Sequence, residues 1–456
     1  MVAVALVATV VRLPGVYTQA FWQDEVASAR IINEPTFPGM LAHVARTEST
    51  PPLWYALGWL LRRAGTPMQD IRLLSVVAGA LLAALVVDVA RSVVPLPFAA
   101  LAGLFVALGG ALVGHGQELR SYELLALLSL VFARCLLAEV AAPSRRRELA
   151  LGASVAAGGL THYFFAFSVI AALMWVWLDR DVRAVRRRAT AAIVAGGAIA
   201  AGWAPVMLAQ FHQGRFWWIG SFQLRTVIAV PSRLFTSAYA NSTAGIVLSV
   251  AGLLLVAAGA ARLSRASAAG RLVAALALGP LAEAAAVWSG GVRIFAERNL
   301  IGIAPFAAIA AVAGLAAVPR RAAVAVGVAT AAFLLLPFTP FARDGGGTPP
   351  YDAMARELVA EGWTPSQPVA VFGSFFPYRS PLEWYLPHQP VLDASRLSSR
   401  VCKTLFVVRG DDVQRLHLTI AIRADRALRG ATILVDPASA PSCAQPIVSG
   451  RLAALS

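Results

Sequence analysis

"MVAVALVATV" (residues 1–10) opens the chain, and "FWQDEVASAR" (residues 21–30) follows shortly after it. The first stretch is uncharged and apolar except for one threonine, whereas the second carries the adjacent acids Asp24 and Glu25 beside Trp22. The apolar stretch lacks a basic n-region and an A-x-A-like cleavage site, and many apolar stretches follow. We therefore interpret it as a retained membrane-spanning helix rather than a signal peptide. Two acids then lie at the mouth of a membrane helix.

Composition supports an integral membrane protein. Of 456 residues, 58% are hydrophobic and 14% are charged, and the mean hydropathy is +0.68. Soluble domains are about half apolar and about a quarter charged. The net charge of +15 comes mostly from arginines in short clusters between apolar runs. The excess of positive charge in cytoplasmic loops explains these clusters better than nucleic-acid binding does, so we expect no nucleic-acid partner.

Eleven segments are apolar enough, and close enough to about 20 residues, to cross a bilayer. They are roughly 1–19, 71–90, 97–114, 122–140, 149–166, 165–179, 190–209, 244–261, 271–288, 299–318 and 321–339. In this topology alternate loops lie on the same side of the membrane. Loops on one side carry all of the basic clusters, which are at Arg91, 145–147, 179–188, 262–271 and 320–321. Because cytoplasmic loops carry such clusters, we predict a multi-pass plasma-membrane protein with a cytoplasmic N-terminus and an extracytoplasmic C-terminus.

Residues 20–70 form the first outer loop of this topology. Segments 24–34 and 51–64 have helical patterns but are too short or too polar to span, so we predict that both are interfacial helices. Pro51 and Pro52 suit a first helical turn, where a missing N–H costs little. If 51–64 spanned the membrane instead, every later loop would change sides and the arginine clusters would lie outside.

The tail differs in composition from the rest of the chain. "RDGGGTPPYD" (343–352) indicates a linker, "YDAMARELVAEG" indicates a helix, and "PVAVFG", "CKTLFVVRG" and "ATILVD" indicate short buried strands. We predict a transmembrane domain over 1–342 and a small extracytoplasmic α/β domain over 343–456. An extracytoplasmic domain can keep a disulfide, and we expect Cys402 to pair with Cys443, the alternative being two separate thiols. Cys135 lies in an apolar run, and the cysteine spacing predicts no zinc site.

Polar residues gather at the predicted outer ends of the spans. Charges near a membrane are costly, so these residues are functional candidates. They are Trp22, Asp24, Glu25, His43 and Glu48 in the first loop, Arg72, His115, Gln117, Glu118, Arg120, Tyr122 and Glu123 at the next two ends, His162 and Tyr163 in "THYF", and Arg293, Glu297 and Arg298. A carboxylate pair suits a general base and its partner. Arginines suit phosphate oxygens, and the combination favours sugar transfer from a lipid-linked phosphate.

Each residue also has a purely structural interpretation. Acids at the N-terminus of an interfacial helix are favourable, so Asp24 and Glu25 also fit a cap. His162 also fits a hydrogen-bonded packing residue, and Arg298 an interfacial anchor. The tryptophans also fit the aromatic belt of a membrane protein. The joint occurrence of these residues at one side favours the functional interpretation over any single structural one.

The order of several segments resembles a known family. "DE" (24–25) follows the first span, "PPL" (51–53) opens an interfacial helix, and "RLLSVVAGAL" begins the second span. This order resembles the GT-C glycosyltransferases, specifically the protein O-mannosyltransferase and aminoarabinose-transferase branch. "GQELRSYELLALLSL", "THYF" and "ERNLIGIAPF" resemble the related bacterial group of predicted mannosyltransferases. The likeness covers roughly residues 10–320, and the ordered set is more specific than any one motif.

The resemblance implies the fold, the donor and the site. It implies an all-α polytopic GT-C membrane protein of about 11 transmembrane helices, to which the C-terminal α/β domain is added. The reaction is an inverting transfer from a polyprenyl-phosphate-linked sugar to an extracytoplasmic glycan, lipid or protein acceptor. Asp24 stands at the position of the family's base and Glu25 at its second acid, while Arg72 matches an arginine near the acids. Arg120 and Arg298 are further candidates for the donor phosphate, and Glu118, Tyr122, His162, Tyr163 and Trp22 for substrate binding or support.

One departure from the family pattern concerns metal. The usual "HPPL" is "TPPL" here, from Thr50 to Leu53. Any role of that histidine is therefore absent or moved to His43 or His162. Some relatives bind a metal near this pocket and others need none, so a divalent ion is possible, but we expect no obligatory one.

Two other function classes remain as alternatives. One is a membrane transferase with a different donor, such as a lipid-linked oligosaccharide. The other is a lipid or sugar transporter, in which inverted repeats and helices broken at the membrane midplane are typical. Here the polar residues lie at the outer ends of the spans and no repeat is visible, which favours sugar transfer. A catalytically inactive scaffold would have the same sequence features.

Overall fold

The computed structural model describes residues 1–214, 216, 219–235, 243–316, 351–360, 369–371, 379–386, 391–393, 405–408, 425–428 and 431–435. They belong to two compact units. The first unit contains Met1–Tyr17 and Ala29–Ala342, and the second contains Thr18–Ser28 and Arg343–Ser456. The short segment with Asp24 and Glu25 therefore groups with the C-terminal residues.

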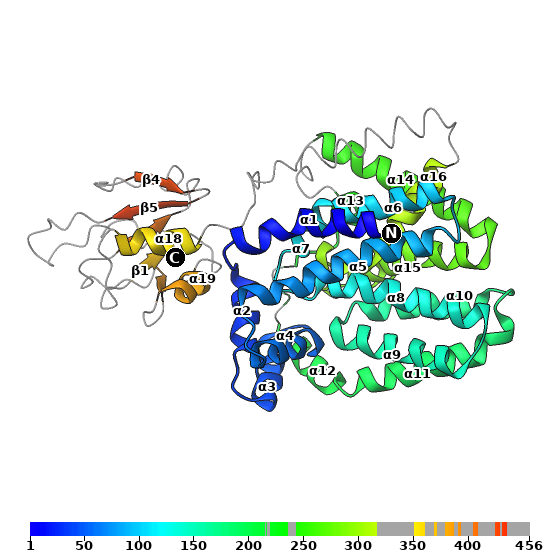
Figure 1. Cartoon of the computed structure of the whole chain (residues 1–456), viewed down its shortest axis with the longest axis horizontal. Coiled ribbons are helices and arrows are strands. Elements are labelled where there is room, and N and C mark those ends of the chain that lie inside the picture. Colours follow the sequence, from blue (N-terminus) through cyan, green and yellow to red (C-terminus); the bar gives the residue numbers. More distant parts are fainter. Residues whose placement is uncertain are drawn as a thin grey trace, which may run out of the picture. The chain divides into compact units, whose positions relative to one another are not determined.

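Helices occupy each of the ten predicted spans up to residue 316 (Figure 1). They are α1 (Val2–Thr18), η1 (Gln69–Arg72) with α5 (Leu73–Ala90), α6 (Leu96–Leu108) with α7 (Gly110–His115), α8 (Tyr122–Ala141), α9 (Arg145–Thr161), α10 (Phe165–Leu178), α11 (Arg186–Ala201) with α12 (Ala204–His212), α14 (Thr243–Ala266), α15 (Ala268–Ser289), and η3 (Glu297–Ile303) with α16 (Ala304–Leu315). Two short elements, η2 (Arg183–Val185) and α13 (Leu224–Arg233), connect them. The eleventh predicted span, 321–339, lies outside the described residues.

Several of these helices are long and apolar enough to cross a membrane. Among the described residues five pass this test by length and composition, and up to seven pass if two bent pairs each count as one span. The shorter helices fail on length, since α6 and α10 have 13 and 14 residues. The chain is thus a multi-pass membrane protein by its apolar helices, whereas the count of eleven stays a prediction.

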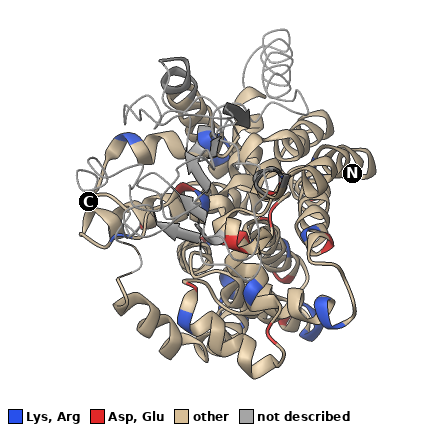
Figure 2. Ribbon diagram, turned by 90° about the vertical axis from the view of Figure 1, so that its left-hand side faces the viewer, with Lys and Arg blue, Asp and Glu red and all other residues tan. Residues whose placement is uncertain are grey.

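The helix surfaces match an apolar environment. All twelve residues of α16 are buried, as expected for a helix that is apolar on every side. By contrast, α1 exposes Val2, Leu6 and Val10 to 75%, 60% and 68%, in a stripe with the four-residue spacing of one helix face. Most of the ribbon in Figure 2 is uncharged. Such a stripe suits lipid contact.

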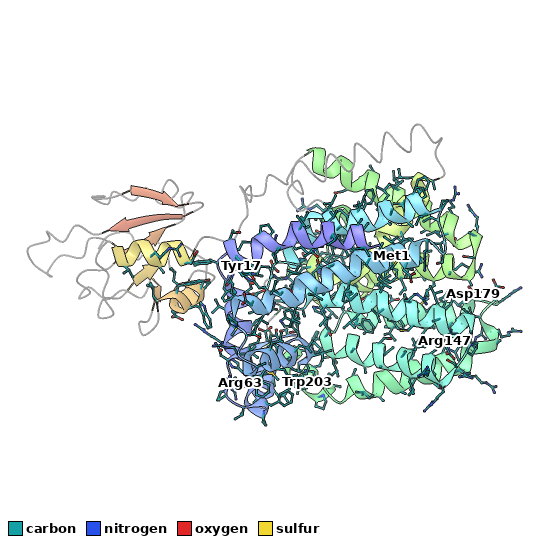
Figure 3. The ribbon with its side chains drawn as sticks, viewed as in Figure 1. Met1, Tyr17, Arg63, Arg147, Asp179 and Trp203 are labelled. Atoms are coloured by element: carbon teal, nitrogen blue, oxygen red, sulfur yellow. The ribbon has the colours of Figure 1, made fainter. Side chains whose placement is uncertain are left out.

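Three of the predicted cytoplasmic connections lie together at one end of the bundle. Arg147 and Asp179 are at this end, and Tyr17 and Arg63 are at the other (Figure 3). Arg271 forms two hydrogen bonds of 2.6 and 3.0 Å with Asp179, and Arg188 lies 3.5 Å from Glu148. These ion pairs join three connections that carry arginine clusters. These three clusters therefore share one end, while the side of the membrane that this end faces stays a prediction.

The first outer loop contains three helices where the sequence analysis expected two. They are α2 (Gln23–Ile32), α3 (Phe37–Thr47) and α4 (Leu53–Arg63). The additional helix α3 begins at a cap, because the Thr36 side chain accepts a hydrogen bond from the Gly39 N–H, and Pro38 stands in its first turn. This Thr-x-Pro signal was missed. The two predicted prolines, Pro51 and Pro52, lie just before α4 rather than inside it.

The second unit contains a five-stranded sheet and two helices. The strands are β1 (Val369–Val371), β2 (Val391–Asp393), β3 (Leu405–Val408), β4 (Asp425–Leu428) and β5 (Ala431–Val435), in the order β2-β1-β3-β5-β4. β1 runs parallel to β2 and β3, whereas β5 runs antiparallel to β3 and β4. α18 (Tyr351–Ala360) contacts α19 (Arg379–Tyr385), which contacts β2. The linker over most of 343–352 and both Cys402 and Cys443 lie outside the described residues.

The first-loop segment of this unit is anchored on α19. The Phe21 N–H donates to the Tyr385 hydroxyl at 2.8 Å. The Phe21 ring meets the Trp384 ring edge-on, with centroids 6.1 Å apart. A backbone hydrogen bond and an aromatic contact thus fix the chain three residues before Asp24.

Small residues let helices of the first unit approach closely. α9 and α11 meet at Gly152 and Gly196, where a Cβ added to Gly196 would lie 2.1 Å from the Gly152 carbonyl oxygen. Lipid tails are as apolar as leucine, so membrane helices associate by close van der Waals packing rather than by the hydrophobic effect. The glycine pair therefore stabilises the contact between α9 and α11.

We expect Gly196→Ala to lower the free energy of unfolding by about 1–3 kcal/mol, because the new methyl group forces the two backbones apart. The neighbouring Gly197 is the matched control, since a Cβ there meets nothing within 4 Å. Gly197→Ala should be neutral or stabilising, because alanine favours a helix by about 1 kcal/mol over glycine. Thermal unfolding in detergent measures both variants. Equal midpoints for the two would contradict the close approach.

Candidate functional site

The ring of Tyr122, the first residue of α8, is the centre of a cluster of polar residues. Its centroid lies 4.6 Å from the His115 ring and 6.0 Å from the His162 ring. The guanidinium carbons of Arg120 and Arg298 lie 5.9 and 6.0 Å from the same centroid. These residues come from α7, the turn before α8, the turn after α9, and η3. The structure thus brings together four predicted site residues: Tyr122, Arg120, Arg298 and His162.

An ion pair ties Arg120 to the first outer loop. Its Nη1 lies 3.3 Å from Glu48 Oε2, and both side chains are 8% exposed. The same Nη1 donates to the Tyr55 hydroxyl at 3.3 Å. Burial raises the pKa of Tyr55, so this hydroxyl stays protonated. Glu48, which the sequence analysis named as a candidate, and Tyr55, which it did not name, therefore orient one of the arginines of the site.

Thr50, which stands where the pattern that the sequence resembles has a histidine, takes part in this contact. It lies 3.1 Å from the Tyr55 hydroxyl, oxygen to oxygen, and is buried. The threonine thus extends the hydrogen-bond chain from Arg120 through Tyr55. A hydroxyl is a poor ligand for the metals that prefer imidazole.

His162 is a neutral imidazole in the turn between α9 and α10, outside both helices. Burial, together with the positive charges of Arg120 and Arg298, lowers its pKa to about 3. The Phe164 N–H points at Nδ1 at 3.2 Å, so this nitrogen accepts and the proton lies on Nε2. A neutral histidine adds no charge repulsion between the two arginines and offers one N–H donor.

Three more predicted residues support the surrounding turns. Glu118 Oε2 lies 3.0 Å from His115 Nδ1, which places the carboxylate behind one of the rings that contact Tyr122. The Tyr163 hydroxyl donates to Gln210 Oε1 at 2.6 Å and so links the α9–α10 turn to α12. Arg72 Nη1 donates to the Val16 carbonyl at 2.9 Å and so packs against the end of α1.

The predicted catalytic acids lie in the first turn of α2. Glu25 Oε2 accepts a hydrogen bond from the Trp22 N–H at 3.3 Å, as the carboxylate of a capping box does. The Ser28 hydroxyl donates to the Asp24 carbonyl at 3.0 Å. Glu25 thus has the capping role that the sequence left open. Asp24, Glu25 and Trp22 belong to the second unit and are described with it.

Sequence analysis missed one charged residue inside the first span. Arg12 lies on α1 with no exposed surface and forms an ion pair with Glu123, the neighbour of Tyr122. A charged residue inside a predicted span was itself the signal that marks this position as a candidate.

Comparisons with known proteins identify solved structures with a similar fold. No protein-family model matches the chain, and no curated protein matches its sequence. Among solved structures, ArnT from Cupriavidus metallidurans in the apo state is similar with a TM-score of 0.55 and 15% identity over 98% of both chains. The same enzyme bound to undecaprenyl phosphate gives a TM-score of 0.51 at 15% identity, over 98% of this chain and 99% of that one. The archaeal oligosaccharyltransferase AglB from Archaeoglobus fulgidus, in complex with an inhibitory peptide and a dolichol-phosphate, gives 0.51 at 13% identity, over 89% and 69%.

These likenesses show the fold of the chain. Each identity is 15% or less, while the alignment with ArnT spans nearly the whole of both chains. The predicted resemblance to GT-C glycosyltransferases is therefore confirmed at the level of fold. The mannosyltransferase branch stays a prediction.

The lowered pKa of His162 predicts a loss of stability in acid. Between the ordinary value of 6.5 and about 3, the unfolded chain binds a proton that the folded chain does not. The free energy of unfolding then falls as the pH falls through this range. We expect His162→Asn to reduce the drop in unfolding midpoint between pH 7 and pH 5. The exposed His212→Asn is the control and should keep the wild-type drop; an equal drop in all three proteins would contradict a buried neutral imidazole.

Proposed function

We propose that the chain transfers a sugar, with inversion, from a polyprenyl-phosphate-linked donor to an extracytoplasmic acceptor. The observation that carries this proposal is the pair of arginines on Tyr122. Arg120 and Arg298 come from segments far apart in the sequence, and both guanidinium groups lie within about 6 Å of one ring centroid. Neutral His162 lies beside them.

This arrangement suits the phosphate of a lipid donor. A guanidinium presents planar N–H donors that match phosphate oxygens, and it keeps its charge where water is scarce. Glu48 forms an ion pair with Arg120, and Arg298 brings a second guanidinium to the same ring. A group with one or two negative charges then binds by charge and by hydrogen bonds together.

The similar solved structures support the same donor class. ArnT has been solved with undecaprenyl phosphate, and AglB with a dolichol-phosphate. Both ligands are long-chain polyprenyl phosphates. A chain with the same fold and an arginine pair at the Tyr122 cluster suits a donor of this kind.

Asp24 is our candidate for the general base. An acceptor hydroxyl is a poor nucleophile, so a carboxylate must take its proton while the acceptor is held in line with the anomeric carbon. Glu25 accepts a hydrogen bond from the Trp22 N–H, which suits an orienting role, while Asp24 stands at the position of the base in the family that the sequence resembles. We further propose that no obligatory metal takes part, because Thr50 stands where the family has a histidine.

The acceptor side follows from the predicted orientation. With the arginine clusters in the cytoplasm, the predicted topology puts the first outer loop and the start of α8 on the extracytoplasmic side. The acceptor is then a cell-envelope glycan, a lipid or a protein, and the residues 343–456 are predicted to lie on the same side.

A second candidate is transfer of a lipid-linked oligosaccharide. The likeness to AglB, an oligosaccharyltransferase, favours this alternative over transport. The two candidates differ in their donors: a polyprenyl monophosphate carrying one sugar, or a lipid-linked oligosaccharide. A panel of radiolabelled donors of both kinds, incubated with the purified full chain and cell-envelope acceptors, separates them.

Replacing the proposed base should stop transfer without unfolding the protein. We expect Asp24→Asn to lower the rate of sugar transfer at least about a hundredfold, the usual effect of removing a general base. Donor binding and the unfolding midpoint should stay at wild-type values. Glu25→Gln should reduce the rate less and lower the midpoint, because it weakens the contact with Trp22. A fully active Asp24→Asn protein would exclude Asp24 as the base, and the same assay with a chelator tests the metal proposal.

Removing the second arginine of the cluster should weaken the binding of the lipid phosphate. We expect Arg298→Gln to reduce the affinity for undecaprenyl phosphate at least about tenfold, because a charge-assisted hydrogen bond contributes roughly 1.5–3 kcal/mol. Arg293, exposed and five residues earlier, is the matched control. Calorimetry or a lipid-binding assay in detergent measures both. A loss confined to Arg293→Gln would place the phosphate site elsewhere.

A further inference from the structure

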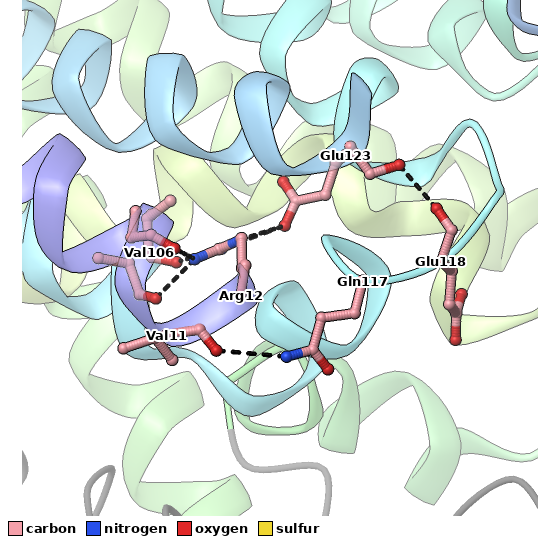
Figure 4. Close-up of polar contacts among 9 residues, drawn as sticks. Val11, Arg12, Val106, Gln117, Glu118 and Glu123 are labelled. Carbon is pink, nitrogen blue, oxygen red and sulfur yellow. Dashed lines mark hydrogen bonds and ion pairs between the residues drawn. The ribbon is translucent and has the colours of Figure 1, made fainter. Parts of the chain in front are cut away.

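Arg12 and Glu123 form an ion pair inside the helical bundle (Figure 4). Arg12 Nη2 and Nε lie 3.1 and 3.3 Å from Glu123 Oε1, and neither side chain has exposed surface. Arg12 belongs to α1 and Glu123 to the first turn of α8. The pair therefore connects two helices 111 residues apart in the chain.

Every N–H of the Arg12 guanidinium has an acceptor. Besides the two hydrogen bonds to Glu123, Nη1 donates to the Ala107 and Ala8 carbonyls at 2.8 and 3.2 Å, and Nη2 donates to Val106 at 3.2 Å. The five donors of an arginine are thus all used. The carbonyls of Val106 and Ala107 are free to accept because α6 ends at Leu108 and leaves its last carbonyls without helical partners.

Two glycines provide the space for this side chain. A Cβ on Gly79 would lie 2.5 Å from Arg12 Nε, and one on Gly116 would lie 2.4 Å from it. Gly79 belongs to α5 and Gly116 to the turn before α8. Both segments thus have glycine where the guanidinium needs space, and Gly116 belongs to the turn that carries Arg120.

The same turn has two further contacts with neighbouring helices. The Gln117 side-chain amide donates to the Val11 carbonyl of α1 at 3.2 Å. The Ser75 hydroxyl of α5 donates to the Glu118 carbonyl at 2.7 Å. Residues 116–122, which we call the cluster turn, are thus fixed against α1 at Gln117 and against α5 at Glu118.

We propose that Arg12 is a positioning residue, which through Glu123 orients the cluster turn and with it the Tyr122 ring and Arg120. The inference rests on the proposed binding of a lipid phosphate at that cluster. A buried ion pair gives little net stability, since apolar residues of similar volume pack as well or better. Apolar residues do not, however, fix the direction of a helix start. Arg12 does so with five hydrogen bonds to three segments.

The test removes the pair without leaving a buried charge. The variant Arg12→Met/Glu123→Leu replaces both charges with apolar side chains, so its fold does not depend on an uncompensated ion. The matched control is Arg134→Met/Asp88→Leu, which removes a pair of 2.9 Å at the opposite end of the bundle. Arg12→Lys is the graded variant, because lysine keeps the charge but has three donors instead of five.

Three measurements on the full chain in detergent decide the outcome: the unfolding midpoint, the affinity for undecaprenyl phosphate, and backbone hydrogen exchange. In Arg12→Met/Glu123→Leu we expect a folded protein with a lower midpoint than wild type, because the Val106 and Ala107 carbonyls lose their donor. Affinity should fall about tenfold, and exchange in the cluster turn should rise at least about tenfold. Arg12→Lys should lie between this variant and wild type, and the control pair should change neither quantity.

The outcomes separate this inference from the proposed function. If wild-type protein does not bind undecaprenyl phosphate, the proposed function fails, while exchange in the cluster turn still decides whether Arg12 positions it. Unchanged exchange in the double variant overturns the inference whatever the affinity. Faster exchange with unchanged affinity shows that the turn is positioned by Arg12 but that donor binding does not depend on it, which also overturns the inference as stated.

Discussion

A guanidinium inside an apolar helical bundle must find an acceptor for each of its N–H groups, and this constraint shapes the part of the first unit that carries the Tyr122 cluster. Arg12 meets it with Glu123, with the last carbonyls of α6 and with its own helix. The break between α6 and α7 is therefore more than a bend, because it exposes the carbonyls that the arginine needs. Where irregular backbone occurs at membrane depth, its polar groups must be satisfied by neighbouring protein in this way.

The Tyr122 cluster depends on the same constraint one residue further along the chain. Glu123 is held by Arg12, and Tyr122 next to it contacts Arg120, Arg298, His115 and His162. Burial keeps His162 neutral, which lets two arginines lie close to it without a third positive charge. Glu48 and Tyr55 then hold Arg120 from the side of the first outer loop. The position of the groups around the Tyr122 ring therefore depends on the charges of the arginines, on the burial of His162 and on the hydrogen bonds of Arg120.

Close helix packing supplies the rest of the framework. The hydrophobic effect does not drive apolar helices together in lipid. Close backbone contacts such as the one between Gly152 and Gly196 must therefore stabilise the bundle. The second unit is stabilised differently. It contains a mixed sheet in which β1 has a parallel neighbour on each side, and its Phe21 is hydrogen-bonded to α19. The segment before Asp24 is therefore ordered by residues more than 350 positions later in the chain.

Local pattern in the sequence was enough to locate most elements. Apolar runs of spanning length predicted the positions of ten helices, and charged clusters of one parity predicted that Arg147 and Asp179 share an end of the bundle. These features depend on the composition of single segments, which the sequence contains in full. The short helix α3 was missed because its Thr36 and Pro38 signal lies between two segments already assigned.

Only the tertiary structure decided which polar residues meet. The sequence named Arg72, Arg120 and Arg298 alike, but the fold places Arg120 and Arg298 on Tyr122 and packs Arg72 against the end of α1. It also turned Glu25 toward the Trp22 N–H and revealed the pairing of Arg12 with Glu123. Such meetings join segments far apart in the chain, and they depend on where helices break and how closely they approach. No periodicity or composition of a single segment contains that information.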